Sequence, residues 1–247
     1  MHSIKLSAAA AGRRLLLIFW VGGLLLAICN RLQAQELLLE EEVPDSLNRT
    51  FGPNRMLFLH LQVGVGFAAG PQSAGMPQEP WRSANWSAGL NARLKYTPYT
   101  GLGLELNYVR DFYLLRQEES KTFPYTRQFD QERFIVQQVG ANVYHRFFFS
   151  GNKTEHPGFF LDVGGGLLLP LELRHQYHYQ DPDEDSQIEV RRNDLPYKET
   201  FVFQAIARAG WNRFALFARY RLTPVLNPDE VAPRFSPFHF GLSLGIY

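Results

Sequence analysis

Charged side chains of both signs recur at alternate positions in segments that are otherwise apolar or small. Arg93 and Lys95, for example, alternate with Ala92 and Leu94. Alternate residues of an extended strand point to the same side, so such charges share one face. Buried charges must be paired, and the pattern therefore predicts an enclosed network of ion pairs and hydrogen bonds. Its predicted members are Arg93, Lys95, Glu105, Arg146, Asp162, Glu172, Arg208 and Arg219.

Two groups of residues invite a metal-binding interpretation. His175 and His178 lie three positions apart, so in a strand they point to opposite faces and cannot share one ion. The segment 181–189 carries acidic residues at alternate positions, and such oxygen ligands suit calcium, but it lacks the glycine of a calcium loop. We expect a solvated loop, and contact with lipopolysaccharide through divalent ions stays open. No metal or cofactor site is predicted.

A hydrolase would need a serine, a histidine and a carboxylate within hydrogen-bond reach. His239 and Ser243 share one face of the segment 235–247. Their spacing in a strand is roughly 13 Å, which is too long for a nucleophile and its base. We therefore expect no enzymatic activity.

Period-2 alternation positions all of these residues on strands. In the segment 57–67, the even positions are mostly glycine or polar residues, while the odd positions are apolar. A closed barrel in lipid, apolar outside and polar inside, satisfies both faces. The apolar face of this segment consists of Leu57, Leu59, Leu61, Val63, Val65 and Phe67.

The fold class predicted is all-β, an eight-stranded antiparallel up-and-down transmembrane barrel. The expected strands are 56–68, 84–96, 101–114, 133–149, 159–179, 200–211, 213–222 and 235–247. Short connections at 97–100, 150–158 and 211–213 alternate with long ones at 69–83, 115–132, 180–199 and 223–234. This alternation is typical of outer-membrane barrels, which have short periplasmic turns and longer external loops.

Aromatic residues gather at both ends of the predicted strands, where the rings of a membrane barrel form interfacial girdles. They make up 14% of the sequence, while the mean hydropathy is only −0.22, far below that of a helical membrane protein. The predicted girdle contains Trp86, Tyr96, Phe147, Phe159, Trp211, Phe214, Tyr220 and Phe238.

The N-terminal region has the features of a secretory signal: basic residues precede an apolar stretch at 15–29. We predict a signal peptide at 1–35, a periplasmic linker at 36–54 and the outer-membrane barrel at 55–247. Cys29, the single cysteine, lies within the predicted signal, so the mature chain would have no thiol chemistry. The net charge of +1 and the lack of a basic patch with interleaved aromatics argue against a nucleic-acid partner.

The hairpin around Tyr96-Thr97-Pro98-Tyr99 and the terminal segment 238–247 make the chain resemble small outer-membrane β-barrels of the OmpA and OmpX type, in particular those of the Bacteroidetes. The resemblance covers about 56–247. It implies a terminal aromatic residue, here Tyr247, that the barrel assembly machinery reads. The family has no fixed catalytic residues.

The resulting hypothesis is a monomeric outer-membrane protein with both termini in the periplasm. Its role would be structural, adhesive or a docking role in an envelope complex, exerted through its loops, among outer-membrane lipid and lipopolysaccharide. Three alternatives stay open: a soluble lipocalin-like barrel that binds a small apolar ligand, an enzyme that modifies lipid A, and a narrow pore. An eight-stranded barrel is only wide enough for side chains to fill it, which argues against the pore.

Overall fold

The computed structural model describes residues 51–70, 73, 75–150, 155–181, 186–193, 195, 197–227 and 233–247. The chain divides into two units, Met1–Asn48 and Arg49–Tyr247, and the described residues belong to the second. The predicted signal peptide and the linker up to residue 50 lie outside the described residues. Only the last residues of the linker, 51–54, are among them.

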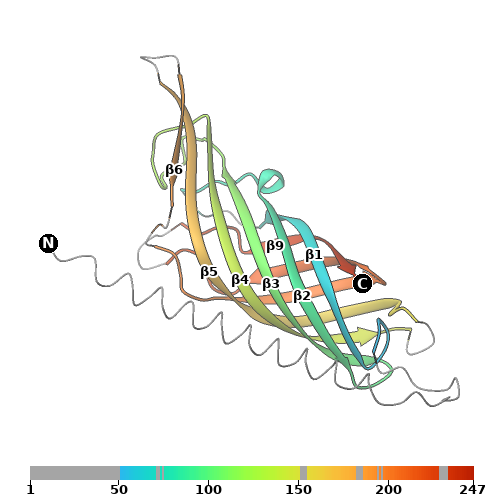
Figure 1. Ribbon diagram of the computed structural model, residues 1–247. Coiled ribbons are helices and arrows are strands. Elements are labelled where there is room, and N and C mark those ends of the chain that lie inside the picture. The colour runs from blue at the N-terminus through green and yellow to red at the C-terminus, as the bar shows by residue number, and fades with distance from the viewer. Residues whose placement is uncertain are drawn as a thin grey trace, which may run out of the picture. The chain divides into compact units, whose positions relative to one another are not determined.

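Nine strands and one short 3-10 helix, η1 (Pro80–Arg82), make up the regular structure of the described residues (Figure 1). Each strand lies on or within a few residues of a predicted alternating segment, except the short strand β6. The strands are β1 (Leu57–Ala69), β2 (Ala84–Lys95), β3 (Thr100–Leu115), β4 (Gln131–Phe148), β5 (Phe159–Asp181), β6 (Ser186–Arg192), β7 (Val202–Trp211), β8 (Phe214–Arg221) and β9 (Phe238–Ile246).

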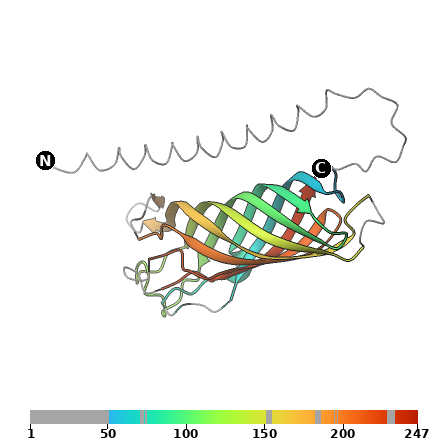
Figure 2. The ribbon, with the colours of Figure 1, turned by 90° about the horizontal axis from the view of Figure 1, so that it is seen from below.

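Eight of these strands close into a ring, as predicted. The order is β4-β3-β2-β1-β9-β8-β7-β5, and β4 pairs in turn with β5. All pairings are antiparallel, including that of β1 with β9, which joins the first strand of the ring to the last. Figure 2 shows the strands winding obliquely around the barrel.

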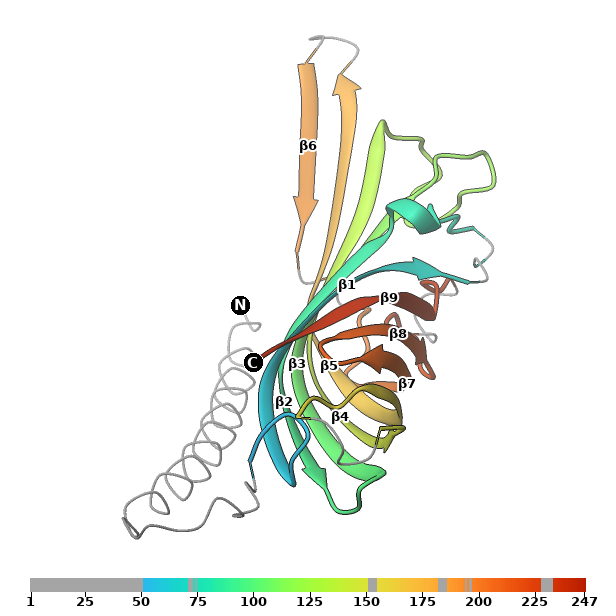
Figure 3. The ribbon, with the colours of Figure 1, turned by 90° about the vertical axis from the view of Figure 1, so that its right-hand side faces the viewer.

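The ninth strand, β6, was not predicted. The connection 180–199, predicted as one long loop, contains β6. This strand pairs with the last part of β5, from His175 to Asp181. The same side of β5 pairs with β7 only as far as Leu168. The β5–β6 hairpin therefore projects beyond the ring (Figures 1 and 3). Because many residues in 181–192 are charged, this segment lacks the apolar alternation that marks a strand. It forms a strand because its backbone pairs with β5.

The two ends of the barrel differ in their connections. At the short-turn end lie the connections 96–99, 149–158 and 212–213, and Tyr247 lies there too, with its ring 4.9 Å from that of Phe58. At the loop end lie 70–83, 116–130, the β5–β6 hairpin with 193–201, and 222–237. These names are used below.

The barrel is apolar outside and polar inside. Leu61, Val65 and Leu216 are exposed by 55%, 62% and 64%, whereas Arg93, Asp162 and Arg208 are exposed by 4% or less. Strand pleating alone separates these two sets, because neighbouring residues point to opposite faces. The inside-out assignment made from the alternation is therefore the one observed.

An apolar core fills the lumen at the loop end. Strands supply Val109, Phe134 and Leu168, which are fully buried and point inward. Each long connection adds residues that pack on them, and together these connections close the loop end. The contributed residues are Met76, Phe123, Leu195, Tyr197, Val225, Leu226 and Phe235.

Candidate functional site

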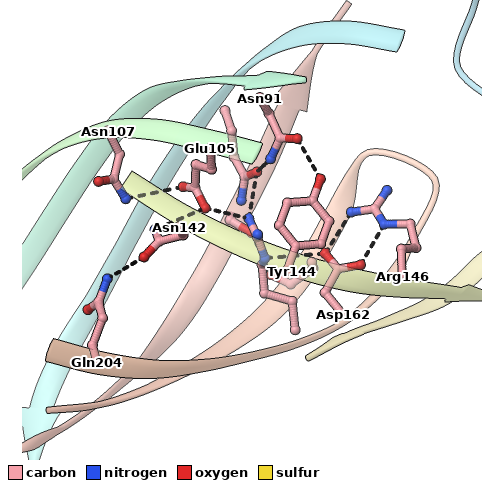
Figure 4. A network of polar contacts seen from close by, with 12 residues as sticks. Asn91, Glu105, Asn107, Asn142, Tyr144, Arg146, Asp162 and Gln204 are labelled. Atoms are coloured by element: carbon pink, nitrogen blue, oxygen red, sulfur yellow. Dashed lines mark hydrogen bonds and ion pairs between the residues drawn. The ribbon is translucent and has the colours of Figure 1, made fainter. Parts of the chain in front are cut away.

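Polar side chains from six strands form one connected network across the middle of the lumen (Figure 4). Gln62 on β1 accepts hydrogen bonds from Asn91 Nδ2 on β2 at 2.9 Å and from Arg208 NH1 on β7 at 2.8 Å. Glu105 Oε2 on β3 lies 3.1 Å from Arg208 NH1 and accepts a bond from Asn142 Nδ2 on β4. These contacts tie opposite walls of the barrel together.

Asp162 on β5 is the most heavily used acid of this network. Arg146 donates to it through Nε at 2.5 Å and through NH2 at 2.7 Å. Arg208 Nε lies 3.3 Å from Oδ2 of Asp162, the oxygen that also accepts from Arg146 NH2. The carboxylate is fully buried, so one negative charge is shared between two enclosed guanidinium groups. Charge-assisted pairs of this kind are among the strongest polar contacts in proteins.

Tyr144 occupies the axis of the lumen next to this pair. Its hydroxyl donates to Asn91 Oδ1 at 2.5 Å, and the Arg208 guanidinium lies 4.5 Å from its ring centre. Gly103 faces Tyr144 in the β3–β4 register, and a Cβ at residue 103 would lie 2.0 Å from the tyrosine Cζ. The glycine is thus required by the close approach of the ring.

A second polar group lies nearer the loop end. Asp111 pairs with Arg221 and accepts a hydrogen bond from Gln138 Nε2 at 2.5 Å. Tyr113 OH lies 3.0 Å from Nε2 of His239 and also contacts Arg221. The sequence analysis did not assign these residues to the network, although Asp111 and Arg221 lie on the predicted inward faces of their strands.

The residues considered for hydrolysis have other partners. His239 Nε2 contacts Tyr113, whereas Ser243 Oγ donates to the carbonyl oxygen of Ala215 at 3.4 Å. The two side chains share the inward face of β9, but within the described part of the chain no hydrogen bond joins them. This geometry lacks a serine activated by a neighbouring base.

Seven of the eight predicted lumen residues point inward and are buried. Arg219 donates to Asn85 Oδ1 at 2.9 Å, Lys95 donates to Asn54 Oδ1 at 2.6 Å, and Arg93 contacts the carbonyl of Pro53. The other four are those of the Asp162 and Glu105 groups. Residues 53–54, predicted to belong to a linker, thus contribute acceptors to the short-turn end of the lumen.

Glu172 is the exception, and its assignment to the lumen was wrong. The register between β4 and β5 shifts at Gln137/Gln138, so that Gln138 pairs with Pro170 and Gln137 pairs with Glu172. The extra residue, Leu171, reverses the facing of β5 beyond it. Glu172 therefore lies on the outer wall, where it pairs with Arg174 at 2.7 Å. Pro170 cannot donate to a strand ladder and so marks this irregularity in the sequence, but the predicted alternation of β5 was continued through it without a change of phase.

A third polar cluster lies where connection 116–130 packs on the parts of β4 and β5 that extend beyond the closed ring. Glu132 is fully buried, pairs with Lys121, and lies 2.7 Å from His175 Nε2. Lys121 also donates to Gln117 Oε1 at 2.8 Å and to the Arg127 carbonyl at 2.9 Å. Burial alone would raise the pKa of Glu132, but hydrogen bonds from His175 and Lys121 and the Lys121 charge hold it below its ordinary value. This cluster fixes connection 116–130 against β4 and β5.

The two histidines considered as metal ligands lie in different surroundings. His175 is buried and stacks on Phe134 at 4.5 Å, whereas His178 is half-exposed and lies 3.7 Å from Glu189. Glu189 is bound by Arg191, whose hydrogen bond lowers the pKa of that carboxyl. The central acidic residues, 182–185, lie outside the described residues. Among the described residues, no group of three or more candidate metal ligands occurs.

The predicted girdle residues lie on the outer wall near both ends. Phe159, Trp211 and Phe214 are exposed by 63%, 56% and 63% at the short-turn end, together with Tyr96 and Phe147. At the loop end, η1 adds Trp81, which is 74% exposed and 6.1 Å from the ring of Phe67. Trp86, Tyr220 and Phe238 also lie on the outer wall at the loop end, and Phe238 is partly covered.

The lumen has little free space. A cavity of about 30 Å³ lies beside Glu105, Arg208 and Arg219, and another of about 20 Å³ lies near the short-turn end. Each has room for only one or two water molecules. Arginine and tyrosine side chains, and the apolar core at the loop end, occupy the rest of the interior.

Comparisons with known proteins add a structural likeness only. No family model matches the sequence, and no curated protein matches it. The chain is similar to a solved structure of Ail, the attachment invasion locus protein of Yersinia pestis, in complex with the heparin analogue sucrose octasulfate; the identity is 8%, the TM-score is 0.31, and 76% of this chain and 94% of that chain are covered. Among the described residues, no helix has the length and apolar character needed to cross a membrane. The described part of the chain is a closed, all-β barrel with an apolar outer wall, a charged lumen and a closed loop end.

Proposed function

We propose that this protein is an integral outer-membrane β-barrel that presents its loop end for docking. The observation that carries the location is the outer wall, where the ring strands expose large apolar side chains. Leu102, Val143 and Leu242 are exposed by 47%, 52% and 58% on three different strands. A wall of this kind is stable when acyl chains cover it.

The docking role is supported by the loop end. A barrel that serves only as an anchor needs no more than solvated loops there. Here the connections contain a buried ion pair between Lys121 and Glu132 and an apolar core around Phe134, and β6 extends β5 beyond the ring. Ordering these segments costs conformational entropy during folding. A surface that is already ordered loses less entropy when it binds a partner, so this order favours a binding role.

The orientation we propose places the short-turn end in the periplasm and the loop end outside. Lipopolysaccharide would surround the outer rim, where Trp81 and Trp86 lie on the wall. Tyr247 would serve the barrel assembly machinery as a terminal aromatic residue. We expect a monomer, since the eight-stranded ring has no unpaired strand edge within the wall.

Detergent dependence tests the location. We expect the purified protein to be monodisperse and rich in β-structure in detergent, and to aggregate when the detergent is removed. A protein that stays monodisperse in plain buffer would contradict the proposal. In whole cells, a membrane-impermeant thiol reagent added outside should label Ser120→Cys in connection 116–130 and should not reach Tyr99→Cys at the short-turn end.

The docking role is tested separately. Partners crosslinked to the intact protein in its own membrane are compared with those of a variant in which 182–185 and β6 are replaced by a short Gly-Asn turn. We expect a specific envelope protein or surface ligand to be lost while the barrel still assembles. Identical crosslinking profiles would contradict the docking role and leave the membrane location unaffected.

The alternatives fit the geometry less well. A lipocalin-like barrel would need an apolar lumen, but this lumen contains a charged network across its centre. A pore would need a water-filled path, and the cavities found in the described lumen are small. A lipid A enzyme would need an activated nucleophile, and Ser243 bonds to a backbone carbonyl. We therefore expect no single-channel steps in planar bilayers and unchanged lipid A in a deletion strain.

A further inference from the structure

We propose that the short-turn half of the lumen binds one small monovalent anion of chloride size. The site is the cavity of about 20 Å³ that lies between Phe58, His60, Arg93, Arg208 and Tyr247. This volume has room for one particle of about the size of water. Neither the polar network nor the docking role described above requires such a site.

The charge around this cavity is one-sided. Four arginines line it, Arg93, Arg146, Arg208 and Arg213, and no acidic side chain belongs to the described lining, although Asp162 pairs with Arg146 and Arg208. Across the described lumen, six buried cationic side chains face three buried carboxylates. Uncompensated charge inside a barrel is costly, so an anion at this position would be strongly stabilised.

Arg93 is the lumen cation at the centre of this proposal. It is 1% exposed, and its guanidinium lies between the rings of Phe58 and Phe148, 5.1 Å from each ring centre. One of its nitrogens contacts the carbonyl of Pro53. Among the described residues, no carboxylate lies within ion-pair distance of it, in contrast to Arg146 and Arg208, which share Asp162.

Four described residues that line this cavity each carry a buried polar atom without a hydrogen-bond partner. Within the described part of the chain, the atoms without a recorded hydrogen bond include Nε of Arg93, NH2 of Arg208, Nδ1 of His60 and the hydroxyl of Tyr247. All four residues line the cavity. Each atom can act as a donor, His60 through its Nδ1–H tautomer, and buried donors are nearly always paired. Four donors around one small space suit an anion better than a cation.

The aromatic walls also favour an anion. The rings of His60 and Phe58 stack at 4.8 Å, and the Tyr247 ring meets Phe58 edge-on at 4.9 Å. Ring edges carry partial positive charge, so a ring edge that faces the cavity would add to the attraction of the arginines for an anion. The Arg213 guanidinium covers the Tyr247 ring at 4.7 Å on the side of the short-turn end.

Bromide replaces chloride and can be located by anomalous diffraction, which tests the site directly. Crystals of the detergent-solubilised barrel grown in sodium bromide should show an anomalous peak in this cavity, near Arg93 Nε. Thermal unfolding, followed by circular dichroism at constant ionic strength, should rise saturably as chloride replaces gluconate. We expect a gain of roughly 3 to 6 °C at a tenfold excess of chloride over its dissociation constant.

Three variants make the test specific. Arg93→Gln and the milder Tyr247→Phe, which keeps the terminal ring, should lose the bromide peak and most of the chloride-dependent gain. Arg219→Gln is the matched control, because Arg219 is a buried lumen arginine that lines the other cavity. It should lower the unfolding temperature but retain the full chloride response.

Three results would overturn the proposal. The first is an unfolding temperature that is the same in chloride as in gluconate, together with water alone in the cavity. The second is a chloride response that Arg93→Gln and Tyr247→Phe both retain. The third is a bromide peak without any chloride-dependent gain, which would indicate an adventitious ion only.

Discussion

The two halves of the barrel interior are filled by different kinds of side chain. In the short-turn half, the inward positions are held by charged residues. Arg146 and Asp162 pair side by side on the adjacent strands β4 and β5, and Arg208 on β7 meets Glu105 on β3 across the lumen. In the loop half, inward positions such as Val109 and Phe134 are apolar and pack against residues of the connections. The outer wall is apolar along both halves.

The difference shows what each half has available to fill it. The short-turn half has almost no chain beyond its tight turns, so strand side chains must meet across the axis, and long polar ones reach far enough. The loop half has long connections that fold inward and bring apolar residues with them. The short connections therefore leave one half of the lumen to be filled by polar contacts, and the long connections allow the other half to be filled by an apolar core.

The largest effect should come from breaking the charged half. Asp162→Asn removes the carboxylate shared by Arg146 and Arg208, and we expect a loss of about 3–5 kcal/mol in the free energy of unfolding. Glu172→Gln on the same strand makes the same charge change on the outer wall, where the cost should be below about 1 kcal/mol. Urea unfolding from detergent measures both. Equal losses would contradict the distinction between lumen and wall.

Breaking the apolar half should cost slightly less but affect different observables. Phe134→Ala leaves a cavity in the loop-end core, with an expected loss of about 3 kcal/mol. The connections should become sensitive to protease while the strand signal in circular dichroism is retained. Phe147→Ala, an outward residue of the same strand, is the control and should leave protease sensitivity unchanged. Loss of the whole barrel in Phe134→Ala would show that the two halves are not separable.

A smaller effect is expected from crowding the axis. Gly103→Ala places a Cβ against the ring of Tyr144 and should cost about 1–3 kcal/mol through overpacking. Gly165→Ala is the matched control, since the nearest atom to its added Cβ is a backbone oxygen at 3.1 Å. Combining Gly103→Ala with Tyr144→Phe, which retains the ring, should bring no rescue, whereas Tyr144→Leu should restore part of the loss.

The smallest and most local effect should be an increase in the protease sensitivity of the loop half at acidic pH. The pKa of Glu132 is depressed in the folded protein, so its contribution to stability is complete above the ordinary glutamate pKa. That contribution is lost as the pH falls through the folded value. Protease cleavage of 116–130 should therefore increase at acidic pH, with less change at the short-turn end. In Glu132→Gln, cleavage should be raised at neutral pH and nearly independent of acidification.

The strands and their facing were predictable from the sequence because the signal is local. Alternation over ten residues marks a strand, and the polarity of its two faces tells which one is enclosed. Seven of the eight proposed lumen residues were placed on the correct face by this rule. Glu172 was not, because a single bulged residue reverses the phase of everything beyond it.

The loop-end core was missed, although the sequence carried a sign of it. Alternation fails at 113–115 and 134–136, where consecutive residues are apolar, and in the structure both sides of these segments are covered. A continuous apolar run predicts a strand that is covered on both faces, so these segments indicated that the inward face at the loop end is covered as well as the outward one. The connections that form this layer have no regular period, so their apolar residues could not be assigned from the sequence.

The sequence alone determined a closed barrel, its inward charges and the alternation of its connections, because periodicity and turn residues act between near neighbours. The tertiary structure decided which charges meet: that Asp162 serves two arginines, that Lys121 finds Glu132, and that Arg93 faces a cavity with no acid. Pairing across a lumen depends on register, shear and bulges summed around the ring, and no local pattern records that sum.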